Sequence, residues 1–407
     1  MNSSGTRVPS PRLYLAGWTT TTLGTGIVFP LTAVYLRDQL GLPVGSVSLY
    51  FVLFAIAGLV ANPFAGLLSV RFGPGPIAVA ATAFQTIGPL LLAAHGPDAL
   101  SLTASVFSGA GTGIFYAVLT PLLIQLFGEA KLGRMLAAQN AVSAASVGAG
   151  AVIGGLLVEA LGEAGYRLSF LANGISFLAF GLVLAAVLRG VAAPSAEVSR
   201  SISPASVLAP FVDRRFLVIL VLQGALVLFG FGQVESVMPI VLRDSAQLQV
   251  IGISVVLAVN SLSIIVLQAP VLRLVERIGH VRSLRAALGC WALSLVALWL
   301  SAAVSGPVVA VVAAAGWALL FALGECFIAP SMQPLVVATA PPGRLASYTA
   351  STSLVHSLGN LAAPALFLPV FTGLGFGAYL GFQLAGYLMA VLVLLISAGA
   401  RASASVR

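Results

Sequence analysis

Two glutamates and one histidine lie deep inside long apolar stretches of the sequence. Glu235, Glu325 and His356 each stand several residues or more from the nearest end of such a stretch. An ionisable side chain in apolar surroundings is costly, so each is a functional candidate by default. A carboxyl whose charged form is disfavoured can bind and release a proton near neutral pH, and it can pair with a cation. The three residues therefore predict proton coupling; the alternative is a neutral or paired side chain that joins helices.

Polar and aromatic side chains in the same stretches are candidates for lining a substrate cavity. Such cavities are mostly apolar, with a few placed polar groups. The cavity candidates are Gln85, Tyr116, Asn140, Phe231, Gln233, Asn260 and Gln333. Gln223, Gln268, Trp18 and Trp317 belong to the same class. Any one of these side chains can instead be a packing or lipid-facing residue.

Several kinds of chemistry lack the residues that they need. The three histidines show no pairing at helical spacing, which leaves a metal or haem without ligands. Cys290 and Cys326 lie in apolar segments far from any CxxC pattern, so we expect reduced packing residues. The glycine runs 109–113 and 148–154 lie within apolar segments with no preceding strand, which favours close helix packing over nucleotide binding. We therefore expect no metal, no cofactor and no enzyme activity.

Composition indicates an integral membrane protein. The 407 residues are 59% hydrophobic and only 7% charged, whereas soluble domains carry roughly 25% charged residues. The apolar runs are long enough to cross a hydrocarbon core of about 30 Å, and backbone groups in lipid must be satisfied within a helix. The net charge of +8 comes from residues scattered between these runs, which argues against nucleic-acid binding.

Twelve membrane spans are predicted, which makes the fold all-α. They cover 13–36, 44–70, 76–95, 99–127, 133–160, 168–189, 215–241, 249–272, 283–302, 307–338, 346–372 and 376–398. Pro30 and Pro239 are predicted to kink the first and seventh spans.

The distribution of basic residues predicts the orientation. With the N-terminus inside, sixteen of the nineteen Arg and Lys residues lie on the cytoplasmic side, and only Arg37, Arg167 and Arg243 lie outside. Both termini are therefore expected in the cytoplasm. Residues 1–10 show no cleavage signal, so the first span is expected to be retained. The strong preference for Arg over Lys is typical of a GC-rich bacterial genome, which suggests the bacterial cell (inner) membrane.

The chain contains an internal repeat. A shift of 206 residues places Gly24, Gly26, Arg37 and Asp38 on Gly230, Gly232, Arg243 and Asp244. A shift of about 210 aligns Arg134 and Ser143 with Arg344 and Ser353. The polar stretch 190–214 is expected to be a cytoplasmic linker between two six-helix halves, 1–189 and 215–407. Duplicated halves are typical of transporters that work by alternating access.

Three motifs resemble those of a known family. Gly66-Leu-Leu-Ser-Val70-Arg71-Phe-Gly73 is similar to the Gly-x-Leu-x-Asp-Arg-x-Gly signature of the major facilitator superfamily, and Glu276, Arg277 and Gly279 belong to a degenerate second copy. Gly150-Ala-Val-Ile-Gly154-Gly155 resembles the Gly-Pro-x-x-Gly-Gly motif of its twelve-span drug:proton antiporters. The resemblance covers nearly the whole chain and implies two pseudo-symmetric six-helix bundles, the major facilitator fold.

The motifs also depart from the family pattern. Val70 replaces the signature acid and Ala151 the motif proline, while Ser105 stands where that branch usually has an Arg. The resemblance implies that the signature turns act as gates at the cytoplasmic ends of the halves. Glu276 is expected to take the gate role, facing the N-terminal end of the fifth span or Arg134.

These observations together predict a secondary active transporter. The leading hypothesis is proton-coupled export of amphipathic small molecules, such as drugs or a secondary metabolite, with a link to multidrug efflux and antibiotic resistance. The alternative is a specific carrier of a polar metabolite such as a sugar or amino acid. A membrane enzyme is disfavoured because the histidines leave a haem or metal without ligands, and a channel or receptor is disfavoured by the duplicated halves with their gate motifs. The expected partners are a small-molecule substrate, protons and membrane lipid, with the protein a monomer.

Overall fold

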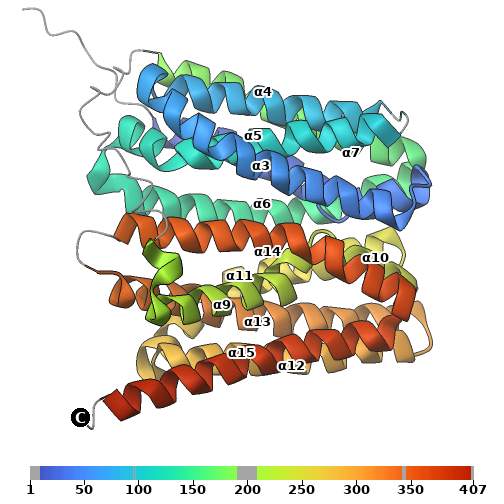
Figure 1. Cartoon of the computed structure of the whole chain (residues 1–407). Helices are drawn as coiled ribbons and strands as arrows, with labels where there is room; N and C mark the ends of the chain where they lie inside the picture. Colours follow the sequence, from blue (N-terminus) through green and yellow to red (C-terminus); the bar gives the residue numbers. More distant parts are fainter. Residues whose placement is uncertain (1–9, 95, 97, 190–208, 342–344, 405–407) are drawn as a thin grey trace, which may run out of the picture. The chain divides into compact units, whose positions relative to one another are not determined.

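The chain forms two compact helical units, Met1–Arg200 and Ser201–Arg407. The computed structural model describes residues 10–94, 96, 98–189, 209–341 and 345–404, and every element in these ranges is a helix (Figure 1). Most of the predicted linker 190–214 lies outside the described residues.

The described residues of the first unit form six long helices and three short ones. In chain order they are α1 (Pro11–Val28), α2 (Thr32–Val34), η1 (Tyr35–Gln39), α3 (Val44–Phe72), α4 (Pro74–Ala93), α5 (Asp98–Phe127), η2 (Glu129–Lys131), α6 (Leu132–Leu161) and α7 (Glu163–Leu188). The second unit contains α9 (Arg214–Phe229), η4 (Phe231–Gln233), α10 (Met238–Ser245), α11 (Val250–Ile278), α12 (His280–Ala303), α13 (Pro307–Thr339), α14 (Leu345–Leu374) and α15 (Phe376–Ala404).

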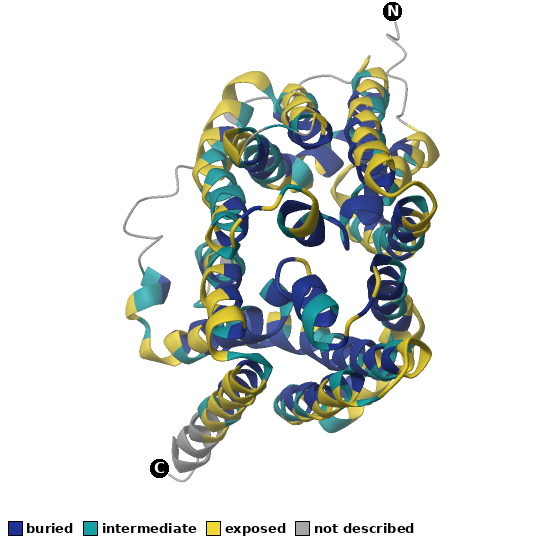
Figure 2. Ribbon diagram, turned by 90° about the vertical axis from the view of Figure 1, so that its right-hand side faces the viewer, coloured by how far each residue is buried: buried dark blue, intermediate teal, exposed yellow. Residues whose placement is uncertain are grey.

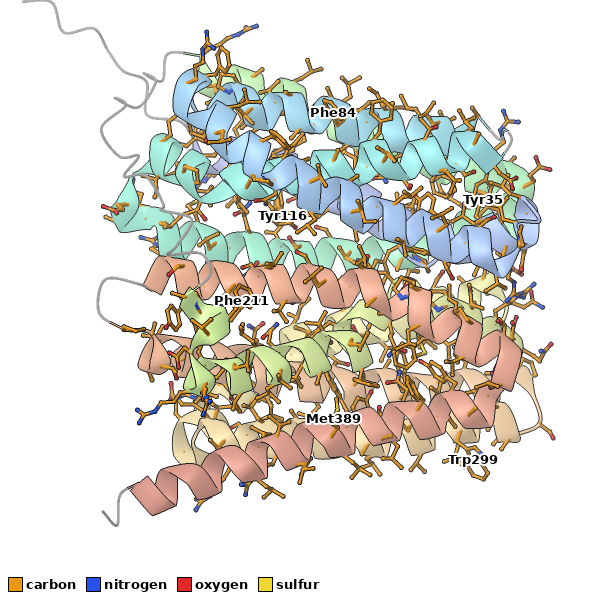
Figure 3. All side chains as sticks on the ribbon, viewed as in Figure 1. Tyr35, Phe84, Tyr116, Phe211, Trp299 and Met389 are labelled. Carbon is orange, nitrogen blue, oxygen red and sulfur yellow. The ribbon has the colours of Figure 1, made fainter. Side chains whose placement is uncertain are left out.

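Eleven helices in the described ranges are long and apolar enough to cross a membrane, and they correspond to the second to twelfth predicted spans. The helix α1 is not among them, because Arg12 and the four threonines Thr19 to Thr22 make it less apolar. It nevertheless packs along the membrane helices α6 and α7. Large apolar side chains such as Phe84, Trp299 and Met389 are exposed on the helix surfaces, as expected of groups that face lipid (Figure 3).

The first and seventh spans are interrupted near the prolines predicted to kink them. The helix α1 ends at Val28, and Pro30 has no N–H to continue the ladder. In the second unit α9 ends at Phe229, and α10 begins at Met238 with Pro239 in its first turn. The kink predicted at Pro30 is confirmed and is a break in the helix, whereas the seventh span already breaks after Phe229 and Pro239 lies in the first turn of the helix that follows. The halves close the following turn alike, with Leu36 O accepting from Leu42 N at 3.0 Å and Leu242 O from Leu248 N at 3.3 Å.

The internal repeat is visible in helix bounds and in packing. Helix α11 begins 206 residues after α3 and also ends 206 residues after it. The glycines that follow these helices, Gly73 and Gly279, have φ values of +82° and +81°. Helix α1 packs on α6 and α7 as α9 packs on α14 and α15, and α5 packs on α3 and α4 as α13 packs on α11 and α12.

The later helices correct the predicted offset. Helix α6 ends at Leu161 and α14 at Leu374, a shift of 213 residues and not about 210. Helices α12 and α13 contain 24 and 33 residues, against 20 and 30 in α4 and α5, and these differences raise the shift from 206 to 213. Ser143 therefore corresponds to His356 and not to Ser353.

Glycines bring α1 and α6 into backbone contact. A Cβ atom on Gly150 or Gly154 would collide with backbone atoms of Leu23 and Ile27, and one on Gly26 would collide with the backbone of Val147. Helices in lipid associate largely through such close approach, because lipid gives little hydrophobic drive. Each long helix consequently shows a buried face and an exposed face (Figure 2).

The glycine run of α5 brings this helix into close backbone contact with α3 on one side and α4 on the other. Gly109 and Gly113 lie against the backbone of Phe54 and Gly58 on α3, while Gly111 lies against Ala81 and Gln85 on α4. The prediction that both glycine runs are packing surfaces is confirmed.

Asp213 ties the start of α9 to α14. Its Oδ1 accepts hydrogen bonds from the backbone N–H of Arg215 at 2.9 Å and Phe216 at 3.4 Å, and its Oδ2 accepts from the Tyr348 hydroxyl at 2.9 Å. Partial burial acts to raise the pKa of Asp213, but these hydrogen bonds and the charge of Arg215 outweigh it and hold the pKa below its usual value. The rings of Phe216 and Tyr348 pack edge to face 4.5 Å apart.

The α1–α6 contact predicts a sharp difference between two glycines of one helix. Gly154→Ala should lower the thermal unfolding temperature in detergent by several degrees, because the methyl group meets the Ile27 carbonyl. Gly133, near the start of α6, has open space around it, so Gly133→Ala should leave the temperature unchanged or slightly higher. Equal melting temperatures for the two variants would refute the contact.

The Asp213–Tyr348 hydrogen bond predicts a pH-dependent stability. A carboxyl whose pKa is lowered by folding stabilises the folded state above its unfolded pKa of about 3.9, and this stabilisation is lost as the pH falls through the folded value. Tyr348→Phe should therefore melt below the wild type at pH 7, and the gap should shrink as the pH falls below 4.

Tyr387→Phe is the matched control, since the buried Tyr387 hydroxyl makes no hydrogen bond with a described residue. The difference in melting temperature between Tyr387→Phe and the wild type should not change with pH over this range. A gap for Tyr348→Phe that stays constant down to pH 3 would contradict a bond to an ionised Asp213.

Candidate functional site

Glu325 lies near the middle of the 33-residue helix α13, next to an amide of α11. Asn260 Nδ2 donates to Glu325 Oε2 at 3.2 Å and lies 3.4 Å from the Ala318 carbonyl oxygen. Asn260 is buried and Glu325 is partly exposed. The structure thus brings two predicted residues together from helices 65 positions apart in sequence.

Aromatic packing fixes where Glu325 lies along α13 and how α13 is rotated about its axis there. The preceding residue, Gly324, lies against the indole of Trp291 on α12, where a Cβ atom would collide with the ring. Trp291 Nε1 donates to the Phe321 carbonyl at 3.0 Å, and its ring stacks on that of Phe321 with centroids 4.8 Å apart. Trp317 continues the stack at 5.5 Å from Phe321. The predicted aromatic residue Trp317 is therefore buried in the packing behind the carboxyl.

No cation neutralises Glu325 within the described part of the chain. Asn260 is the hydrogen-bond partner found for its carboxyl there, and no arginine, lysine or histidine in the described ranges forms an ion pair with it. The ion pair between Arg37 and Asp38, at 3.0 Å, belongs to η1 and not to a helix centre. A carboxyl with one neutral donor can exist in either protonation state.

Glu235 occupies the interruption of the seventh span, between η4 and α10. Its side chain is exposed, and it makes no hydrogen bond or ion pair with any described residue. The neighbouring Ser236 and Val237 are buried, whereas the Glu235 side chain is exposed.

His356 on α14 faces the first helix of its unit. Its Nδ1 lies 3.3 Å from Gln223 Nε2 on α9, and its ring lies 6.3 Å from that of Phe231. The corresponding position of the first unit holds Ser143, whose Oγ accepts from Trp18 Nε1 at 2.8 Å. Both units thus bridge their first and fifth helices here, and the second unit does so with a titratable ring.

Gln233 is positioned differently from what its prediction as a cavity residue suggests. It is 1% exposed, with its Oε1 accepting from the Tyr379 hydroxyl at 2.8 Å and from Gln383 Nε2, and its Nε2 donating to the Leu228 carbonyl at 3.1 Å. These bonds hold the broken segment η4 against α15. Tyr379 and Gln383 are sites that the sequence analysis missed, although their spacing of four residues on one helix face was a usable signal.

The remaining cavity candidates divide between buried and exposed positions. Gln85 is buried and its Nε2 lies 3.4 Å from Thr112 Oγ1. Tyr116, Asn140 and Gln333 are exposed (Figure 3 labels Tyr116). Their role in a cavity stays a prediction.

A second buried amide lies beside Asn140 and was also missed. Gln139 is 2% exposed, and its Nε2 donates to the Tyr14 hydroxyl at 2.8 Å. Tyr14 and Trp18 are four residues apart on α1, as Gln139 and Ser143 are on α6. Two hydrogen bonds therefore link these helices on one face, one turn apart.

The gate motifs cover the last turns of α3 and α11 and the glycines that follow these helices. Gly66 O accepts from Ser69 Oγ at 2.7 Å, and the Arg71 guanidinium lies 5.3 Å from the centroid of the Phe72 ring. Gly73 and Gly279 supply the positive φ that the turns need. Glu276 and Arg277 are exposed, and neither is paired with a described residue of its own half. The gate role of Glu276 stays a prediction.

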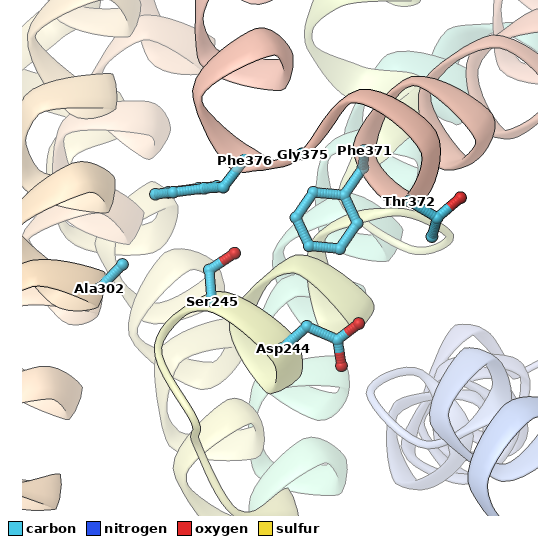
Figure 4. A pocket seen from close by; sticks show the side chains of 7 residues that line it. All are labelled: Asp244, Ser245, Ala302, Phe371, Thr372, Gly375 and Phe376. Carbon is cyan, nitrogen blue, oxygen red and sulfur yellow. The ribbon is translucent and has the colours of Figure 1, made fainter.

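A pocket of about 570 Å³ lies at the opposite end of the second unit from the gate motif, where α14 turns into α15 (Figure 4). Its lining residues are Asp244, Ser245, Ala302, Phe371, Thr372, Gly375 and Phe376. None of the predicted site residues is among them.

Metal ligands do not cluster in the described ranges: no group of three or more His, Cys, Asp or Glu side chains there could hold an ion. Both cysteines are free, as expected, and Cys326 packs with its Sγ 3.8 Å from the Ile264 carbonyl oxygen.

Comparison with known proteins agrees with this architecture. Residues 14–364 match the sequence model of the Major Facilitator Superfamily. No curated protein sequence matches the chain significantly. Among solved structures, a bacterial homologue of the iron transporter ferroportin in its inward-facing state is 18% identical, with a TM-score of 0.71 over 95% of this chain and 98% of that one.

Two further solved structures share the fold at low identity. An auto-inhibited POT family peptide transporter is 13% identical, with a TM-score of 0.76 over 95% of this chain and 96% of its own. The nucleoside transporter NupG is 10% identical, with a TM-score of 0.75 over 96% and 98%. The chain therefore belongs to the major facilitator superfamily and has the fold of its membrane transporters.

Proposed function

We propose that this transporter couples the export of amphipathic small molecules to proton entry, with Glu325 as the residue that exchanges a proton for substrate. The observation that carries the proposal is the Glu325 carboxyl in the middle of α13, hydrogen-bonded to Asn260 and paired with no described cation.

The Asn260 amide suits a carboxyl that changes its protonation state. An ionised carboxylate accepts from the Nδ2 group, as in the present geometry. A protonated carboxyl must donate, and the same amide can accept through its Oδ1 after a rotation about χ2. Asn260 can therefore partner both states without a change of backbone.

The scarcity of fixed charge favours an amphipathic substrate. Glu235 and Glu325 are the two acids in the spans away from the helix ends, and the cavity candidates are otherwise amides and aromatic rings. Such a site suits a lipophilic, neutral or weakly cationic compound better than a sugar or amino acid, which needs several converging polar groups. A cationic compound would compete with the proton for the carboxylate.

Glu235 and His356 are proposed as secondary proton sites. Glu235 is accessible and unpaired within the described residues, and His356 has a single amide neighbour, Gln223. The sixteen Arg and Lys residues that the predicted spans put on one side of the membrane, against three on the other, support placing both termini in the cytoplasm of a bacterial cell.

Glu325→Gln tests the coupling role directly. In inverted membrane vesicles with a pH-sensitive dye, the wild type should release protons when a lipophilic compound from a panel is added. Glu325→Gln keeps a side chain that can bond to Asn260 but cannot exchange a proton, so we expect proton release to fall to the level of empty vesicles.

Glu129→Gln, at the exposed η2 turn, removes the same charge outside the helix centres and should leave proton release unchanged. Normal proton release by Glu325→Gln, with equal protein in the membrane, would disprove the assignment. If the wild type releases no protons with any compound of the panel, the result would favour a carrier of a specific polar metabolite.

A further inference from the structure

The turn between α11 and α12 carries four arginines, of which Arg277 alone belongs to the signature motif. Arg273 and Arg277 lie in the last two turns of α11, and Arg282 and Arg285 in the first two turns of α12. Glu276 is the single acid among them. The equivalent turn of the first unit, residues 67–79, has the same glycine geometry at Gly73 but Arg71 as its one charged residue. The concentration of charge is therefore not required by the fold.

Three of these arginines lie on exposed helix faces. Helix α11 buries Val271 and Val275, and Arg273 and Arg277 each stand two residues further on, on the opposite, exposed face. Helix α12 buries Leu284 and Ala287, while Arg282 is exposed and Arg285 half-buried. Arg273 stands six residues before Gly279, so its Cα lies about 9 Å inside the helix end.

No described residue neutralises this charge. None of the four guanidinium groups forms an ion pair or hydrogen bond within the described ranges. The Arg285 Nε is inaccessible to solvent and also lacks a partner there. A buried arginine N–H without an acceptor is unfavourable, so an anion that reached it would be bound favourably.

The N-terminal end of α12 also favours a bound anion. Its first turn contains no acid, and no side chain caps it. The first N–H groups of a helix and its macrodipole favour negative charge at that end, yet the residue there is Arg282. The N-terminal end of α12 and the arginines around it thus both favour a bound anion.

We propose that the α11–α12 turn binds the phosphate group of an anionic phospholipid. The turn is at the end of two membrane helices, on the side that the arginine count assigns to the cytoplasm, where anionic headgroups attract basic residues. Arginine binds phosphate oxygens in pairs through its planar fork. The depth of Arg273 favours a lipid over free phosphate, because a headgroup reaches the exposed helix face below the membrane surface.

The experiment uses full-length protein, stripped of lipid in a neutral detergent and titrated with dioleoyl phosphatidylglycerol. Native mass spectrometry counts the bound lipids. Arg282→Gln/Arg285→Gln should lose one tight lipid and weaken its apparent affinity about 30-fold, on the order of fivefold for each arginine. Arg277→Gln/Arg282→Gln changes only exposed side chains and should weaken it similarly, which guards against a folding defect from the half-buried Arg285.

The matched control is Arg12→Gln/Arg71→Gln, which removes two positive charges from the same predicted side of the first unit. It should bind phosphatidylglycerol as the wild type does. The proposal would be overturned if the wild type and both turn variants bound the lipid equally. It would also be overturned if the control lost as much lipid affinity as the turn variants. Displacement of the lipid by millimolar inorganic phosphate would assign the site to free phosphate and overturn the lipid assignment. Glu325→Gln should retain the lipid, so this result is independent of the proton-coupling test.

Discussion

Close approach of helix backbones at glycine is the contact on which the structure depends most. In lipid, apolar side chains gain little by leaving one apolar surrounding for another, so packing and hydrogen bonding must hold the helices together. Gly26 and Gly154 bring α1 onto α6, and Gly109 and Gly113 bring α5 onto α3. In the second unit Gly324 and Gly230 leave room for the indole of Trp291. The small residues therefore determine where the larger ones fit.

The same contacts allow polar groups to lie at fixed positions between helices. Where α1 and α6 touch, the pairs Tyr14–Gln139 and Trp18–Ser143 form hydrogen bonds of 2.8 Å each. Where α13 meets α12 at Gly324, the next residue is Glu325, held toward Asn260. A carboxyl placed by backbone packing keeps its position when its charge changes, which a proton carrier requires.

Breaks in the first and seventh spans are the second structural constraint. The residues around Pro30 and from Gly230 to Val237 leave the regular helix, and interrupted helices in transporters expose backbone and side-chain groups near the middle of the membrane. The second break is tied to α15 through Gln233, Tyr379 and Gln383. It leaves Glu235 accessible beside this buried network. Gln233, which we expected in a cavity, thus holds the broken segment against α15, and Glu235 is the accessible group.

The sequence by itself determined the membrane class, the helix bounds to within a few residues for most spans, and the duplication. These depend on local properties: hydrophobic length, the conformations of Gly73 and Gly279, and the missing N–H of Pro30 and Pro239. Tertiary structure decided which polar residues are used. Neighbours such as Gln139 and Asn140 have nearly the same local sequence, but one is buried against Tyr14 and the other exposed, because helix rotation depends on contacts between distant segments. The offset of the later repeat was misjudged by three residues for a related reason: the longer helices α12 and α13 change the alignment without changing any local motif. The pairing of Glu325 with Asn260 joins helices 65 residues apart, and no local pattern contains it.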